Sequence, residues 1–325
     1  MLVLLAACDG GGPGKADDTG GAPGCGIRLE ETFPEDGATD AYVRGPVEFK
    51  LTDPDLTASI EVPGVAGTTS VRGTAGQIVV FTPDAPLEPL TSHEATLTWC
   101  GGTSTIAFTT SEAGLPLADP AALEGVVFAI PFESGRVVEP DGAAGVLGQY
   151  LTQTDLLRVD AVGDTLSVTN ALAIEGASPP AQDWCVPTTR FAEADFGDAP
   201  FFSLAADAVT VVLAGYVVEL LEVEVTGAFS PDGGGIAGGA LAYVMDTRPL
   251  APLVDADDPG SVCKAAVEFA EECEPCPDTG EPWCLRFRLD QLEGAAIEGL
   301  ALADVPGVDC AGCETAPPPD DAVCE

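Results

Sequence analysis

The chain has 325 residues, with 12 lysines and arginines against 53 aspartates and glutamates, so its formal net charge is −41. This excess of negative charge repels phosphate backbones and excludes nucleic-acid binding through a basic surface. A single histidine excludes any site that needs two imidazoles, whereas 11 cysteines indicate an oxidising compartment. The length predicts two domains.

The N-terminal residues Leu5-Ala6-Ala7-Cys8 place two small residues directly before a cysteine. They resemble the lipobox of bacterial lipoproteins, where the signal peptide is cut before a cysteine that then receives lipid. The resemblance implies that Cys8 is lipidated and anchors the protein to a membrane of the cell envelope. We expect the outer membrane, on its periplasmic or surface face.

Residues 1–7 are shorter than a complete signal peptide. We therefore expect a truncated signal peptide, from a start codon assigned too late or a clipped chain; a chance cysteine is the alternative. Residues 9–24 contain no apolar side chain larger than alanine, so residues 8–24 are predicted to be the lipidated cysteine and a flexible tether. The longest later apolar run, Val209–Leu221, is interrupted by Gly215 and Glu219 and is too short for a membrane span.

Residues 25–112 carry several short strand patterns separated by turns. Val47–Leu51 alternates apolar and polar side chains, and Gln77–Phe81 is β-branched and aromatic. Ala95–Trp99 and Thr105–Thr109 follow with similar composition. Short strands at this spacing predict an Ig-like, all-β sandwich without a long helix.

Three motifs occur in order along this domain. Pro34-Glu-Asp-Gly37 opens it, Phe81-Thr82-Pro83 follows, and Phe108-Thr109-Thr110 closes it. The pattern is similar to that of bacterial Ig-like domains of the SbsA type. The resemblance implies a spacer or surface-display module that has no catalytic residues of its own.

The domain departs from that family at two places. His93 stands where the family usually has a tyrosine, and we expect a structural role for this histidine. The family does not require Cys25 and Cys100, which would link the first strand to a late one.

Residues 113–313 are predicted to form a disulfide-rich, mainly β domain with one or two helices, followed by an acidic, proline-rich tail over residues 314–325. The strand patterns lie at Val126–Phe132, Leu157–Ala161, Leu166–Thr169, Glu222–Phe229, Ile236–Met245 and Leu285–Asp290. The helices are expected over Asp141–Gln153 and Val262–Glu272, the second with Ser261 as its N-cap. The segment from Gly227 to Leu285 is similar to uncharacterised cysteine-rich lipoproteins of Gram-negative bacteria, which implies no known activity.

Assigning Cys8 to lipid leaves ten cysteines that we expect to form disulfides, with a pairing that the sequence does not determine. These candidates are Cys25, Cys100, Cys185, Cys263, Cys273, Cys276, Cys284, Cys310, Cys313 and Cys324. Zinc is the first alternative, because Cys273-x-x-Cys276 and Cys310-x-x-Cys313 have the spacing of a four-thiolate site. A redox pair at Cys273-Glu-Pro-Cys276 is the second.

Other motifs carry little chemistry. Ser261-Val-Cys-Lys264 matches the SxxK of serine acyl-enzymes without the accompanying motifs, and Asp255-Ala-Asp257-Asp258 fails the EF-hand pattern. We therefore predict no metal, no cofactor and no catalytic residues.

The sequence predicts a non-enzymatic cell-envelope lipoprotein, in which an Ig-like spacer presents a cysteine-rich binding or structural domain to an envelope protein or polysaccharide. The first alternative is a carrier of an apolar ligand, because the mean hydropathy is +0.23 despite the acidity. A zinc-binding or envelope-polymer-acting enzyme is the second.

Overall fold

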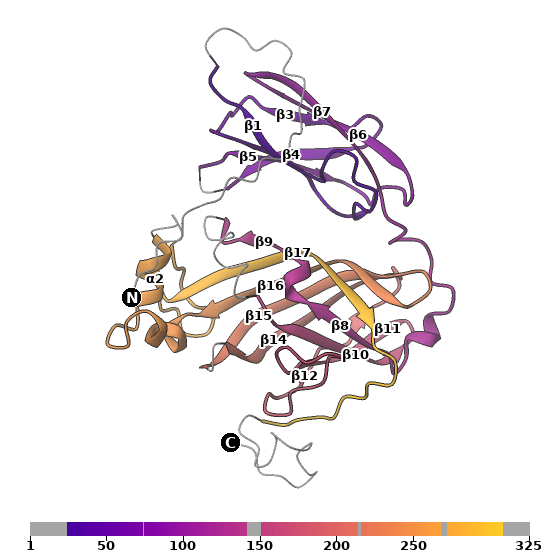
Figure 1. Cartoon of the computed structure of the whole chain (residues 1–325), viewed down its shortest axis with the longest axis vertical. Coiled ribbons are helices and arrows are strands. Elements are labelled where there is room, and N and C mark those ends of the chain that lie inside the picture. Colours follow the sequence, from indigo (N-terminus) through magenta and orange to yellow (C-terminus); the bar gives the residue numbers. More distant parts are fainter. Residues whose placement is uncertain (1–24, 74, 142–150, 214–215, 268–271, 308–325) are drawn as a thin grey trace.

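The computed structural model describes residues 25–73, 75–141, 151–213, 216–267 and 272–307. Cys8, the tether, the tail, Cys310, Cys313 and Cys324 lie outside these residues. The described chain is mainly β, as predicted, with an Ig-like sandwich followed by a disulfide-rich, mostly β domain (Figure 1). In this part of the chain, no helix combines the length and apolar character needed to cross a bilayer.

The N-terminal sandwich consists of two antiparallel sheets. A four-stranded sheet has the order β1-β2-β5-β4, and a three-stranded sheet has the order β3-β6-β7. The strands are β1 (Leu29–Phe33), β2 (Val47–Leu51), β3 (Ser59–Glu61), β4 (Gly67–Arg72), β5 (Ile78–Pro83), β6 (Ser92–Trp99) and β7 (Gly102–Thr109). Phe49 of β2, Val79 of β5 and Leu97 of β6 are fully buried in the common core.

The second domain is one long antiparallel sheet that curls toward closure. Its order is β12-β11-β10-β8-β17-β16-β15-β14, with β13 paired to β11 and β9 to β17. The strands are β8 (Val127–Pro131), β9 (Arg136–Glu139), β10 (Thr154–Val162), β11 (Thr165–Leu172), β12 (Thr189–Arg190), β13 (Ala194–Asp195), β14 (Phe201–Leu213), β15 (Tyr216–Phe229), β16 (Gly235–Asp246) and β17 (Cys284–Ala296).

The two ends of this sheet meet at a seam. There the Ala192 amide donates a hydrogen bond to the Ala205 carbonyl of β14 over 3.3 Å. We call the curled sheet the strand ring. Side chains alternate along its strands, so that on β15 Val223 and Val225 face the buried interior while Glu224 faces outward.

The helices are short. The 3-10 helices span Pro120–Leu123, Phe132–Ser134 and Arg248–Leu253, and α2 spans Ser261–Ala266. The predicted N-cap is wrong: Gly260 occupies that position, because the Ser261 hydroxyl is directed at the carbonyls of Ala251 and Asp255, 3.3 Å from each. Of the helix predicted over residues 141–153, residues 142–150 lie outside the described chain, and residues 151–153 are not helical.

The sandwich packs on the outer face of the strand ring through charged side chains. Arg136 of β9 donates hydrogen bonds to Glu48 of the sandwich (2.7 Å) and to Asp290 of β17 (2.7 Å). Its guanidinium also lies 4.0 Å from the centroid of the Phe33 ring. Arg72 donates a second hydrogen bond to Glu48 over 2.5 Å. These contacts fix how the two domains are oriented.

Candidate functional site

The interior of the strand ring is packed differently at its two ends. At one end the Phe229 ring lies against Phe128 and Phe202, with centroids 5.4 and 4.8 Å apart. Only about 10 Å³ of space remains among these residues and their neighbours. This end is a filled core of the kind that small antiparallel rings of strands contain.

The other end of the interior contains a cavity of about 50 Å³. Apolar side chains from β11, β14, β15 and β16 form most of its wall, including Leu172, Val211, Leu220, Val223 and Leu241. An apolar cavity in a folded protein is a place that small apolar molecules can enter.

The cavity reaches the surface beside Phe132, Leu151, Gln153 and Leu213. These four lining residues are half-buried, whereas the deeper ones are buried. The Gln153 side chain is held by a hydrogen bond from its Nε2 to the carbonyl of Val212, over 2.6 Å. They therefore form the entrance to the cavity.

Two buried polar side chains lie in the wall of the cavity. Asp155 of β10 is 7% exposed and Asn170 of β11 is 5% exposed, and the Asn170 amide donates a hydrogen bond to the Asp155 carboxylate. Burial raises the pKa of Asp155 to about 7, although hydrogen bonds from Asn170 and from the Leu156 amide lower it in part. Near neutral pH the carboxyl group is therefore available both as an acceptor and, when protonated, as a donor.

Tyr243 of β16 brings a third polar group. Its ring stacks on Phe287 with the centroids 5.2 Å apart, and the residue is 8% exposed. Burial raises the pKa of the hydroxyl, which has no hydrogen-bond partner among the described residues. Because Tyr243 lines the cavity, a ligand with one polar group would give this hydroxyl a hydrogen-bond partner.

The cavity residues were not predicted from the sequence, although one signal was present. Asp155 has the same parity along β10 as Leu157 and Val159, which face the core. A carboxylate on the apolar face of a strand is the pattern that would have identified it.

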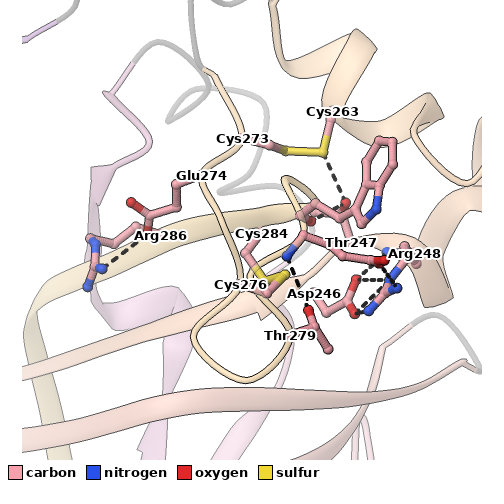
Figure 2. Close-up of a disulfide and its surroundings, with 12 residues drawn as sticks. Asp246, Thr247, Arg248, Cys263, Cys273, Glu274, Cys276, Thr279, Cys284 and Arg286 are labelled. Atoms are coloured by element: carbon pink, nitrogen blue, oxygen red, sulfur yellow. Dashed lines mark hydrogen bonds and ion pairs between the residues drawn. A yellow bond between two sulfur atoms is a disulfide. The ribbon is translucent and has the colours of Figure 1, made fainter.

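Four cysteines of the second domain form two disulfides, which Figure 2 shows, and none of the four lines the cavity. Cys263 is bonded to Cys273, and Cys276 to Cys284. The cysteines of Cys273-x-x-Cys276 thus belong to two different bridges, so the zinc and the redox alternatives are both wrong at this motif. In the sandwich Cys25 is bonded to Cys100, and Cys185 is also disulfide-bonded.

The remaining candidates do not line the cavity. His93 is on β6 with its ring 5.6 Å from that of Phe108, and burial lowers its pKa. Lys264 forms an ion pair with Asp258, and Ser261 is bonded to the carbonyls described above. Within the described ranges, no three side chains of metal-binding type cluster together.

Comparisons with known proteins assign the chain to no family. No protein-family model and no curated protein matches the chain. Among solved structures, L,D-transpeptidase 3 from Mycobacterium tuberculosis is 17% identical with a TM-score of 0.20; the match covers 26% of this chain and 38% of that one. An L,D-transpeptidase from Mycobacterium smegmatis is 12% identical with a TM-score of 0.25, covering 62% and 76%. An LD transpeptidase solved with imipenem is 15% identical with a TM-score of 0.22, covering 59% and 79%.

The proteins in these matches are enzymes. They contradict the prediction that this chain is not an enzyme, and we do not maintain that prediction. TM-scores of 0.20 to 0.25 describe a distant likeness, so no catalytic residue and no reaction is transferred from these structures.

Proposed function

We propose that this chain is a lipid-anchored protein of the cell envelope whose strand ring carries a small amphiphilic ligand. The observation that supports the carrier is the apolar cavity of about 50 Å³, with the Asp155–Asn170 pair and the Tyr243 hydroxyl in its wall. A mainly apolar wall with a few placed polar groups is the usual composition of a small-molecule site.

The size and the lining of the cavity define the ligand class. The space accommodates the inner part of one unbranched alkyl chain, with the remainder passing the entrance between Phe132 and Leu151. A single hydroxyl group on that chain would bond to Tyr243 or Asp155. Each buried methylene contributes about 0.8 kcal/mol, so a short chain binds weakly and reversibly, as a carrier requires.

The rest of the proposal concerns where the carrier sits. The lipobox-like residues before Cys8 and the tether support attachment to the outer membrane. The Ig-like sandwich, with its SbsA-type motifs, would act as the spacer that holds the strand ring away from the membrane. Mass spectrometry of the protein expressed from an extended start tests the anchor: we expect lipid mass on Cys8, and an unmodified, soluble product would contradict it.

Filling the cavity tests the carrier. Val211 of β14 lines the cavity, so we expect Val211→Phe to weaken binding of 1-hexanol at least tenfold in isothermal titration calorimetry, because the new ring occupies the ligand's space. Val217→Phe is the matched control, since Val217 of β15 is 49% exposed and does not line the cavity.

The wild-type chain and the Val217→Phe control should bind with equal affinity. Absence of measurable binding by the wild type, or equal binding by Val211→Phe, would contradict the proposal. If Val211→Phe loses its far-ultraviolet circular dichroism, Val223→Phe fills the same cavity from β15 and replaces it.

A further inference from the structure

A second cavity, of about 410 Å³, lies between the two domains on the outer face of the strand ring. Its floor is the outer face of β16, where Gly238 has no side chain and Ala240 has only a methyl group. Tyr42 and Arg44 of the sandwich cover it from the opposite side. We call this space the interdomain cleft.

The strand register places two opposite charges on either side of that floor. Ala242 of β16 pairs with Glu224 of β15 on one side and with Arg288 of β17 on the other. Neighbouring strands are about 4.8 Å apart, so the backbones that carry the two charges are roughly 10 Å apart. Glu224 and Arg288 both line the cleft and are exposed, and Ala242 is the residue between them in the register.

Arg288 is notable because it forms no ion pair with a carboxylate of the described residues, although Glu139 of β9 is its partner in the strand register and the chain has a net charge of −41. Of the lysines and arginines in the described ranges, only Arg28 and Arg288 lack an ion pair. Arg44, which also lines the cleft, is neutralised by Asp198 and lies 3.5 Å from the Phe201 ring. An available guanidinium recognises a carboxylate through two parallel hydrogen bonds.

Further polar groups line the same cleft. Glu224 accepts a hydrogen bond from the Ser203 hydroxyl over 3.2 Å and keeps capacity for more. The Thr226 hydroxyl and the Gln291 amide line the cleft and have no side-chain hydrogen bond within the described chain. Gln291 adopts a φ of 59°, an uncommon backbone conformation of the kind found at binding sites.

We infer that the interdomain cleft binds a short peptide with free termini, whose carboxylate pairs with Arg288 and whose ammonium group pairs with Glu224. The Gln291 amide and the Thr226 hydroxyl match the alternating donors and acceptors of the peptide groups between those ends. The site lies outside the strand ring and is independent of the cavity inside it.

Binding of trialanine to the full chain, followed by isothermal titration calorimetry, tests this inference. N-acetyl-trialanine removes the ammonium group, and trialanine amide removes the carboxylate. We expect trialanine to bind and each blocked peptide to bind at least tenfold more weakly. Absence of binding by unmodified trialanine would overturn the inference.

Two variants test which side chain binds which end of the peptide. Arg288→Gln and Glu224→Gln should each weaken trialanine binding at least tenfold, with the first variant insensitive to amidation and the second insensitive to acetylation. Arg286→Gln and Glu219→Gln are the matched controls, because both residues lie on the same strands, are exposed and do not line the cleft. Controls that weaken binding as much as the test variants would show a general charge effect and overturn the site.

Discussion

At the scale of single residues, Asp155 couples the cavity to proton concentration. Burial raises its pKa to about 7, whereas the ordinary value is 3.8. Between these two pH values the folded protein holds a proton that the unfolded chain has released. Stability attributable to this residue is therefore largest below pH 3.8 and is lost as the pH rises through 7.

The raised pKa of Asp155 predicts a specific effect of Asp155→Asn, which keeps the shape of the protonated side chain. Between pH 4 and pH 8 the wild type should lose stability relative to the variant, on the order of 4 kcal/mol for the full gap from 3.8 to about 7. Urea unfolding across this range measures the difference. Parallel pH profiles for the two proteins would show that the carboxyl group is not held neutral.

At the scale of secondary structure, the strands that face a core on one side were the predictable ones. Val47–Leu51 forms β2 with the predicted bounds because Val47, Phe49 and Leu51 alternate along it and face the sandwich core. β4 was missed because most of its side chains are exposed and no apolar face marks it. β14 was missed because its apolar residues appeared to continue into the next segment, whereas the structure assigns them to two strands, β14 and β15.

The cavity and the interdomain cleft could not be predicted in the same way. Asp155 and Tyr243 belong to β10 and β16, and their meeting depends on curvature that closes the sheet. The same holds for Arg288 and Glu224, whose proximity requires the register across β16. Periodicity identifies which face of a strand is buried, but not which strands become neighbours.

The disulfides also stabilise the fold. The length of the loop that each disulfide closes ranks their expected contributions. Cys25–Cys100 spans 75 residues, whereas Cys263–Cys273 and Cys276–Cys284 span 10 and 8. In the chain-entropy model these loops correspond to about 4.5 kcal/mol for the long one and about 2.5 kcal/mol for each short one.

We therefore expect the double variant Cys25→Ser/Cys100→Ser to lose more stability than Cys263→Ser/Cys273→Ser. Guanidinium unfolding followed by circular dichroism compares them, with separate transitions for the two domains. An equal or larger loss of unfolding free energy on removing the short-loop disulfide would contradict this ranking. The disulfides would then act through the folded state rather than through the unfolded chain.

At the scale of the whole molecule, the charge network around Arg136 joins the two domains. Burial raises the pKa of Glu48, but hydrogen bonds and charge from Arg136 and Arg72 outweigh it, so the pKa lies below its ordinary value of 4.5. Stability from Glu48 is thus present above pH 4.5 and is lost as the pH falls below it. Interdomain packing and the Asp155 carboxyl group therefore respond to acid in opposite directions.

Removing Arg136 should separate the domains, because it leaves Asp290 without this partner and Glu48 with only Arg72. We expect Arg136→Met to cost about 3 kcal/mol and to increase the radius of gyration in small-angle X-ray scattering. Arg190→Met is the control, since Arg190 is 72% exposed and its pair with Asp160 is long at 3.5 Å; such a pair contributes less than about 1 kcal/mol. An unchanged radius for Arg136→Met would assign the orientation to other contacts.

The bridge between Cys25 and Cys100 has a mechanical consequence for a protein held by its N-terminus. β1 is the edge strand of its sheet, and tension applied before it would peel that strand away one hydrogen bond at a time. Cys25 precedes β1, and its bond to Cys100 delivers the load to the connection between β6 and β7 in the opposite sheet. A force applied before Cys25 would therefore bypass β1 and enter the three-stranded sheet directly.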